Sequence, residues 1–373
     1  MHFTTIIMRN LFLRPLRTVI TIVCVAVAVG GFSVLTGLGR GVEEAWNGSL
    51  VKQGTHILAY RKGVINLLTG TIDQRTVHEI RKVPGVDSVA MELMDVITLE
   101  SGASILVRGW DNDSNLWQET NLLTGHLPAE GSLESVLIGE GLAEALELKP
   151  GDEISPFGAR MKVAGVAQMD NFLNNNSLIM SLQGLQELLD RNGRITVMHI
   201  RVSAGHNEEN LDAVRQNLSR IFPQLTFVLA QTAAQQNDLY QFWRGMSWAA
   251  ALVGLIMGFL IVFNTMLVAV LERTREIGIL AALGWSRPRI MTLVLSESLL
   301  LSALGGILGI ILGYYGLVLL SMHPRLQGFV LVSPSLGAIY QQCFAVMMLG
   351  IGGGFLSAWR AVNLKPIDAL REQ

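Results

Sequence analysis

Residues 246–271 read MSWAAALVGLIMGFLIVFNTMLVAVL, a run that meets no charged side chain before Glu272. A transmembrane helix needs about 20 consecutive, mostly apolar residues, so this run is long enough to cross a bilayer. The composition of the whole chain points the same way, because 50% of its 373 residues are hydrophobic and 16% are charged. Soluble proteins carry about 25% charged residues. Part of the protein is therefore expected to lie in lipid.

Three further runs are long and apolar enough to span a membrane: Val19–Leu38, Leu299–Leu320 and Ile339–Trp359. The last is rich in glycine and has the weakest hydropathy, although small residues are common where membrane helices pack closely. The first could also be a cleaved signal peptide, but it exceeds the roughly 7 to 15 apolar residues of such a segment. This length favours a retained anchor. We predict an α-helical membrane protein with four transmembrane helices.

Positive charges near the four runs predict their orientation, since short loops rich in Lys and Arg stay in the cytoplasm. Such charges precede the first run, fill the loop after the second and follow the fourth: Arg9, Arg14, Arg17, Arg273, Arg275, Arg287, Arg289, Arg360, Lys365 and Arg371. We therefore expect a multi-pass protein of the cytoplasmic (inner) membrane. Both termini and the loop 272–290 would be cytoplasmic, and residues 45–243 would lie outside.

The region between the first two runs has a different character. Residues 45–245 hold 16 Lys and Arg against 23 Asp and Glu, whereas the rest of the chain holds 12 against 7. This asymmetry is typical of an acidic external domain on a membrane unit that is basic inside. The pattern of apolar residues predicts short strands alternating with amphipathic helices, and hence an α+β extracytoplasmic domain.

The expected strands of this domain are His56–Tyr60, Val86–Met91, Val96–Leu99, Ser104–Trp110, Ser135–Ile138, Met161–Ala167 and Thr196–Val202. The expected helices are Asp73–Val83, Glu140–Leu148, Leu182–Asp190 and Asn207–Ile221. Within the last helix, Leu211, Val214, Leu218 and Ile221 should share one apolar face, and Asn171–Asn176 reads as a polar loop.

Motifs of enzymes and metal sites are missing. The sequence has no H-E-x-x-H, no G-x-S-x-G and no G-x-x-x-x-G-K-[ST] phosphate loop, so we expect no catalytic, metal or cofactor site in this chain. Each histidine is expected to be a surface residue or a hydrogen-bonded core residue. Cys24 and Cys343 both sit in apolar runs and supply no disulfide framework. A net charge of -2 argues against a nucleic-acid partner.

Two features of the third run need an interpretation. Its glycines at 305, 306, 309 and 313 are better explained by helix packing than by a phosphate loop. Glu297 stands just before the run and is a candidate intramembrane functional acid, because such acids are functional by default. Its nearness to Arg289 also permits an interfacial role, and the sequence leaves both readings open.

The stretch Glu272–Gly284, ERTREIGILAALG, follows the second run directly. In it, Ile277, Leu280, Ala281 and Gly284 have the spacing of one apolar helical face, which is preceded by a cluster of charges. A short amphipathic helix of this kind, just under the membrane, suits a groove on a partner protein or the lipid interface.

This stretch, together with its continuation to Arg289 and the segments Ser296–Leu301 and Gly305–Gly309, resembles the permease motif of the MacB/FtsX-like ABC transporters. The sequence RAVNLKPIDALR at 360–371 resembles the C-terminal signature of that family. Three shorter pieces, at 138–143, 149–152 and 163–166, are similar to its external core. Trp285 departs from the pattern, which generally has a smaller residue there.

The resemblance implies one span, a large external domain and then three spans. It divides the chain into residues 1–44, with an interfacial helix at Met1–Leu13 and the first span, a MacB-like core domain at 45–243, and an FtsX-like permease domain at 244–373. It also implies two copies of a separate cytosolic ATPase that carries ATP and Mg²⁺, and a second permease subunit, either identical or a paralogue. Contact with membrane lipids is expected, and an extracytoplasmic adaptor stays open.

Carried onto this chain, the resemblance assigns an ATPase-coupling segment: Glu272, Arg273, Thr274, Arg275, Glu276, Ile277, Leu280, Leu283 and Gly284. Arg273, Arg275 and Glu276 would be its polar contacts, and Ile277 and Leu280 its apolar anchors. Pro366, Leu370 and Arg371 would belong to the C-terminal motif.

The function implied is a permease subunit that couples ATP hydrolysis to movement of the external domain, for export or extraction of a hydrophobic cargo such as a lipid, lipoprotein, peptide or drug. The alternative is a transmitter of the cell-division type, which activates an external enzyme and transports nothing. The length of the external domain favours transport.

Overall fold

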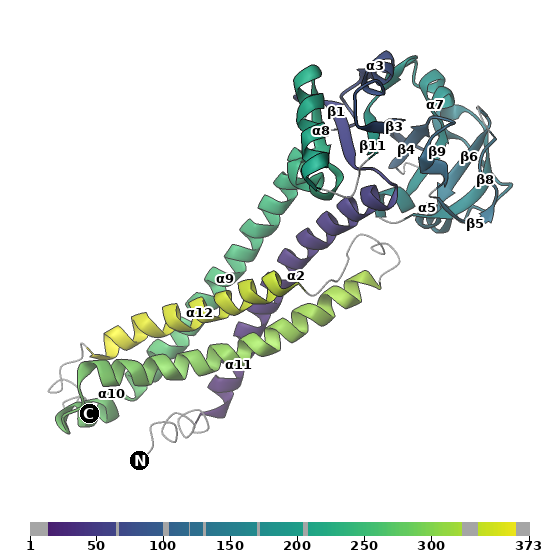
Figure 1. Ribbon diagram of the computed structural model, residues 1–373. Coiled ribbons are helices and arrows are strands. Elements are labelled where there is room, and N and C mark those ends of the chain that lie inside the picture. The colour runs from purple at the N-terminus through teal and green to yellow at the C-terminus, as the bar shows by residue number, and fades with distance from the viewer. Residues whose placement is uncertain are drawn as a thin grey trace. The chain divides into compact units, whose positions relative to one another are not determined.

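The computed structural model describes residues 14–64, 67–99, 104–118, 120–129, 132–169, 172–203, 208–322 and 335–362. The chain forms two compact units (Figure 1). The helical unit comprises Met1–Gly39, Arg244–Leu320 and Val332–Gln373, and the sheet unit comprises Arg40–Trp243 and Ser321–Leu331.

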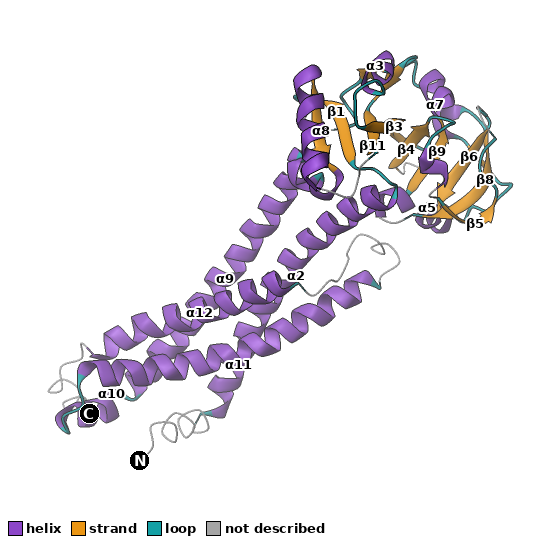
Figure 2. Cartoon of the chain, viewed as in Figure 1, coloured by secondary structure: helices purple, strands orange, loops and turns teal. Residues whose placement is uncertain are grey.

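The helical unit contains the membrane-spanning segments. Among the described residues, four helices are long and apolar enough to cross a bilayer: α2 (Pro15–Lys52), α9 (Asp238–Glu272), α11 (Arg287–Ser321) and α12 (Leu336–Val362). They are the long helices of Figure 2. The four predicted spans are confirmed, and α12 has the lowest hydropathy, as its glycines led us to expect. Two helices continue well past the predicted spans, since α2 runs on to Lys52 and α9 begins at Asp238.

Glycines let α2 and α11 approach closely. Gly305, Gly309 and Gly313 lie four residues apart on α11, where they share one helix face. A Cβ atom on Gly309 would lie 2.7 Å from the carbonyl oxygen of Ala26, and one on Gly313 would lie 2.6 Å from the Cβ of Ser33. No side chain fits at either position without displacing α2. The predicted role of these glycines in helix packing is thus confirmed.

The glycines of α12 have the same role against two other helices. A Cβ on Gly353 would lie 2.6 Å from Val262 on α9, and one on Gly354 would lie 2.6 Å from Ser298 on α11. The hydroxyl of Ser298 donates to the carbonyl oxygen of Gly350 at 2.8 Å. The glycine-rich fourth span is therefore a close-packed helix in contact with α9 and α11.

The sheet unit is built on a ten-stranded mixed sheet of order β12-β1-β11-β3-β4-β9-β6-β8-β5, in which β7 also pairs with β8. A small second sheet joins β10 to β2. The strands are β1 (Ile57–Arg61), β2 (Ile72–Asp73), β3 (Val86–Thr98), β4 (Ser104–Trp110), β5 (Asn121–Gly125), β6 (Ser135–Gly139), β7 (Glu153–Ile154), β8 (Met161–Gln168), β9 (Ser177–Ser181), β10 (Arg194–Ile195), β11 (Val197–Val202) and β12 (Leu225–Leu229).

Short helices accompany the strands of this unit: α3 (Arg75–Ile80), α4 (Asn115–Gln118), α5 (Glu140–Leu146), α6 (Phe172–Asn175), α7 (Leu182–Leu188) and α8 (Glu208–Ile221). With the sheet, they make the predicted α+β domain. The apolar core draws on nearly every strand, and all five residues of β9 are buried.

Several details differ from the predictions. The two strands expected at Val86–Met91 and Val96–Leu99 are one strand, β3. The expected loop Asn171–Asn176 contains the helical turn α6. Ile221, expected on the buried face of α8, is half exposed, and the next residue, Phe222, is buried instead. Of the strands longer than two residues, β5, β9 and β12 were not predicted, because none of them alternates cleanly between apolar and polar residues.

We expect residues 45–243 to fold when they are expressed without the spans, because this region has its own continuous apolar core and needs no disulfide. A cooperative thermal transition followed by circular dichroism would support the prediction. Persistent aggregation, or a spectrum without secondary structure, would show that the core is completed by other parts of the chain.

Candidate functional site

The stretch between the second and third spans folds as a short helix, α10 (Thr274–Ala282). The long helix α9 ends at Glu272, and Arg273 has a non-helical backbone with φ -106° and ψ 15°. At the other end Gly284 has φ 90°, a left-handed conformation that favours glycine, and its N–H donates to the carbonyl oxygen of Ala281. The hydroxyl of Thr274 donates to the carbonyl oxygen of Leu271 at 2.6 Å.

The predicted apolar face of α10 exists, but it packs against its own unit. Ile277 is buried, and Leu280 is half buried against a cluster that includes Ile290 and Leu293. The proposal that Ile277 and Leu280 anchor a partner is therefore revised, because these side chains already hold α10 to α11. The apolar side chains left on the outward face are Ile279 and Leu283, with exposed fractions of 46% and 74%.

The outward face of α10 also carries charge. Arg275 is exposed and lies four residues before Ile279, so the two share a side of the helix with Leu283. Glu276 is exposed as well. Of the polar contacts assigned by resemblance, Arg275 and Glu276 are thus accessible to a partner, and we define the docking face as Arg275, Ile279 and Leu283.

Arg273 has a different partner. Its Nη1 lies 3.2 Å from Oε1 and 3.1 Å from Oε2 of Glu297 on α11. The exposed fractions of the two side chains are 19% and 9%. Glu297 is therefore a buried acid in an ion pair, and neither it nor Arg273 is free to act as a surface contact.

Glu272 pairs with the beginning of the first span. Its carboxylate accepts hydrogen bonds from the guanidinium groups of Arg14 and Arg17, the latter at 2.7 Å.

A small cavity of about 70 Å³ lies between α9, α10 and α11, and its polar lining is supplied by Arg273, Glu276 and Glu297. Trp285 packs on the apolar cluster, and the guanidinium of Arg289 lies over its ring at 5.0 Å.

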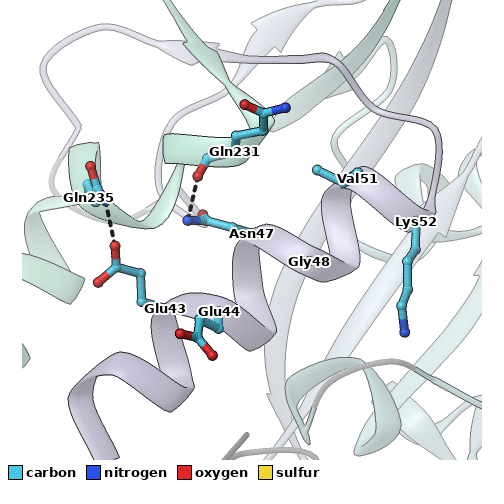
Figure 3. A pocket seen from close by; sticks show the side chains of 8 residues that line it. All are labelled: Glu43, Glu44, Asn47, Gly48, Val51, Lys52, Gln231 and Gln235. Carbon is cyan, nitrogen blue, oxygen red and sulfur yellow. Dashed lines mark hydrogen bonds between the residues drawn. The ribbon is translucent and has the colours of Figure 1, made fainter. Parts of the chain in front are cut away.

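The sheet unit has a polar groove of about 540 Å³ that the sequence did not predict (Figure 3). One wall is the end of α2, which presents Glu43, Glu44, Asn47, Gly48, Val51 and Lys52. Asn47 donates to the carbonyl oxygen of Gln231 at 2.8 Å and accepts from the N–H of Ala234 at 2.9 Å. Glu43 accepts from Gln235 at 2.6 Å. These bonds fasten the end of α2 to the segment that follows β12.

A second unpredicted feature is a polar cluster buried in the sheet. Glu92 on β3 accepts hydrogen bonds from Arg108 and from the indole N–H of Trp110 on β4, the latter at 2.8 Å. Its other oxygen lies 2.9 Å from Nε2 of His199 on β11, and Nδ1 of His199 lies 2.9 Å from the hydroxyl of Thr55. His199 is thus a hydrogen-bonded core histidine, one of the two environments expected for the histidines.

Electrostatics explain how Glu92 stays charged. Burial by itself would raise the pKa of its carboxyl group, but the positive charge of Arg108 and the hydrogen bonds from His199 and Arg108 hold that pKa well below its ordinary value of 4.5. Glu92 and Arg108 therefore form a buried ion pair inside the sheet.

Some predicted sites cannot be placed. Pro366, Leu370 and Arg371 of the C-terminal motif, and the interfacial helix Met1–Leu13, lie outside the described residues. Within the described part of the chain there is no group of three or more His, Cys, Asp or Glu side chains that could hold a metal ion.

Two family models match the chain. Residues 18–221 match the MacB-like periplasmic core domain, and residues 248–366 match the FtsX-like permease C-terminal. The first of these alone covers more than half of the sequence.

Relatives matched nearly end to end are permeases by name. An uncharacterised ABC transporter permease of Methanocaldococcus jannaschii, MJ1507, is 24% identical over 98% of this chain and 97% of its own length. The uncharacterised ABC transporter permease YvrN of Bacillus subtilis is 26% identical over 97% of each.

A longer relative carries an additional activity in its name. The macrolide export ATP-binding/permease protein MacB of Shewanella sp. is 25% identical over 96% of this chain, which spans 58% of the length of that protein. Among solved structures, the chain is similar to the extracellular domain of the transporter YknZ from Gram-positive bacteria, with a TM-score of 0.36, 13% identity, and coverage of 47% of this chain and 99% of that one.

Proposed function

Because this chain belongs to the family of ABC transporter permeases with a MacB-like periplasmic core domain and an FtsX-like permease domain, we propose that α10 couples a separate cytosolic ATPase to its extracytoplasmic domain. The observation that carries the proposal is the docking face of α10. It leaves Ile279 and Leu283 exposed beside Arg275 on a helix that is otherwise anchored by buried contacts. An exposed apolar pair with a charged rim suits a groove on a partner.

Two observations support a separate ATPase. The 373 residues contain no phosphate-binding loop, and the relatives that match over nearly their whole length are named permeases. The relative named ATP-binding/permease protein is the one of which this chain spans 58%. We therefore assign ATP and Mg²⁺ to a partner, and we propose that the chain works with a second permease subunit.

The proposed cargo is hydrophobic, of the class that includes lipids, lipoproteins, hydrophobic peptides and drugs. The test is reconstitution of the chain with its co-purifying ATPase in vesicles that contain a fluorescent lipid or lipoprotein. ATP-dependent loss of the label from the membrane would support transport. Full ATP turnover with retention of every such label, together with activation of an external enzyme, would favour the signalling alternative.

The proposed orientation has both termini and the loop 272–290 in the cytoplasm. In a variant without Cys24 and Cys343, a cysteine at exposed Asn112 should react with a membrane-impermeant maleimide in intact cells. A cysteine at exposed Ser286 should react only after permeabilisation, because it would lie on the inner side. Labelling of Ser286→Cys in intact cells would overturn the orientation.

A further inference from the structure

Glu297 is a buried acid that the proposed function does not use. It lies on α11, yet its partner Arg273 stands at the junction between α9 and α10. We infer that Glu297 is a positioning residue that fixes, through Arg273, the angle at which α10 leaves α9. The inference rests on the proposed coupling role of α10, and it assigns the device that holds this helix in place.

Arg273 forms the bend between α9 and α10. The helical dihedral angles of α9 stop before it and those of α10 start after it. The N–H of Arg273 donates to the carbonyl oxygen of Val270, and its own carbonyl oxygen accepts from the N–H of Ile277. One residue thus belongs to the hydrogen-bond pattern of both helices. The position of the Arg273 side chain can therefore affect the angle between α9 and α10.

The ion pair is suited to fix a direction. Nη1 of Arg273 lies within 3.2 Å of both carboxylate oxygens of Glu297. The side chains around the pair include the apolar Val270 and Val294 as well as the charged Glu276 and Arg17. Charges that are shielded from water attract each other strongly, and hydrogen bonds weaken steeply away from their preferred angles. A buried pair therefore resists rotation as well as separation.

The apolar contacts of α10 with α11 lack this directionality. Ile277 and Leu280 hold the helix to α11 by apolar burial, which depends on area and is non-directional. A cavity of about 70 Å³ lies beside them. The ion pair adds a directional contact between the bend and α11.

Glu272, which precedes Arg273, connects the bend to a different helix. Glu272 pairs with Arg14 and Arg17 at the start of α2, whereas Arg273 pairs with α11. Two consecutive residues of opposite charge thus tie the bend to two different helices. Movement of α10 would then pull on the first and third spans together.

The direct test follows the motion of α10 in the full-length protein in lipid nanodiscs, without Cys24 and Cys343. A nitroxide at Ala282→Cys, which is exposed, should shift toward the mobile spectral component in the Glu297→Gln variant. The charge-swapped double variant Arg273→Glu/Glu297→Arg should restore the wild-type spectrum, because it restores a pair. Ser302→Ala is the matched control, since it removes a buried hydroxyl from the same helix and should leave the spectrum unchanged.

The functional test uses a second nitroxide, at Asn112→Cys in the extracytoplasmic domain, and the complex with the co-purifying ATPase. Glu297→Gln should retain the ATPase, because the docking face is unchanged, but should lose the ATP-driven change in the Asn112 spectrum. The charge-swapped variant should recover that change. A purely structural role would lower the amount of inserted protein without separating ATPase binding from transmission.

The outcomes distinguish the two proposals. An unchanged Ala282 spectrum in Glu297→Gln overturns the positioning role, whatever binds to α10. If the Ala282 label is more mobile in Glu297→Gln, the positioning role stands. If, in addition, the wild-type protein binds no ATPase through α10, the coupling role is overturned. If Glu297→Gln fails to insert, the charge-swapped variant tests the positioning role instead. A mobile Ala282 label in that variant would contradict the inference.

Discussion

The Glu92→Gln variant is expected to lose about 3–5 kcal/mol of the free energy of unfolding of the sheet unit, the usual cost of removing one partner of a buried ion pair. Glu92 has an exposed fraction of 1%, and its two oxygens receive hydrogen bonds from Arg108, Trp110 and His199. Glutamine keeps the shape but leaves the charge of Arg108 buried without its counter-ion. Chemical denaturation followed by tryptophan fluorescence measures the loss, because Trp110 is part of the cluster.

The control for this variant is Glu79→Gln on α3, an exposed acid whose replacement should change the free energy by no more than about 0.5 kcal/mol. Equal stability of the Glu92→Gln variant and the wild type would show that the cluster contributes nothing net. The isolated region 45–243 and the full chain should give the same ranking of variants.

The Glu92 contribution should also depend on pH with a definite sign. The pKa of this carboxyl is lowered by folding, so its stabilisation is fully present above the unfolded pKa of 4.5 and is lost as the pH falls through the folded pKa. The difference in unfolding free energy between wild type and Glu92→Gln should shrink as the pH falls below about 4.5. A difference that grows in acid would contradict this account.

The Leu283→Asp variant is expected to bind the partner ATPase at least about tenfold more weakly. Burial of a leucine in a groove contributes about 1.5–3 kcal/mol, and the variant also places an unpaired charge in that contact. Because Leu283 is 74% exposed, the change should not disturb insertion or folding. Co-purification and ATP turnover of the assembled complex measure the effect.

Two further variants make this prediction specific. Ser286→Asp adds the same charge at an exposed neighbour that has no apolar surface to lose, and should leave binding nearly unchanged. Arg275→Glu should act more weakly than Leu283→Asp, since exposed ion pairs are usually worth less than about 1 kcal/mol. If Leu283→Asp inserts normally and binds the ATPase as tightly as the wild type, the docking face is wrong.

Periodicity predicted the existence of α10 but not its orientation. The spacing of Ile277, Leu280 and Ala281 marks one apolar face, and any such face can pack inward or outward. The pair Arg273–Glu297 decides in favour of inward packing, because it binds the start of α10 to α11. Its members are 24 residues apart, so no local pattern reveals it. The four spans, by contrast, follow from hydropathy, because lipid leaves an apolar helix few alternatives.

The strand β3 shows a similar limit in the sheet unit. An acid in the middle of a strand reads as an interruption, and Glu92 follows the first of the two strands that were expected. In the fold, Arg108 from a neighbouring strand neutralises this acid and His199 from the other neighbouring strand hydrogen-bonds to it, and the strand continues. The sequence shows which residues are polar, but the partners that make a buried polar residue tolerable come from distant positions.

The glycine contact between α2 and α11 restricts how movement can enter the first span. Gly309 and Gly313 face Ala26 and Ser33 almost backbone to backbone, and interiors packed this densely transmit strain. A rotation of either helix about its own axis would drive a neighbouring side chain into the other backbone, whereas a joint change of tilt preserves every contact. Motion that reaches α11 should therefore pass to α2 as tilt and not as torsion.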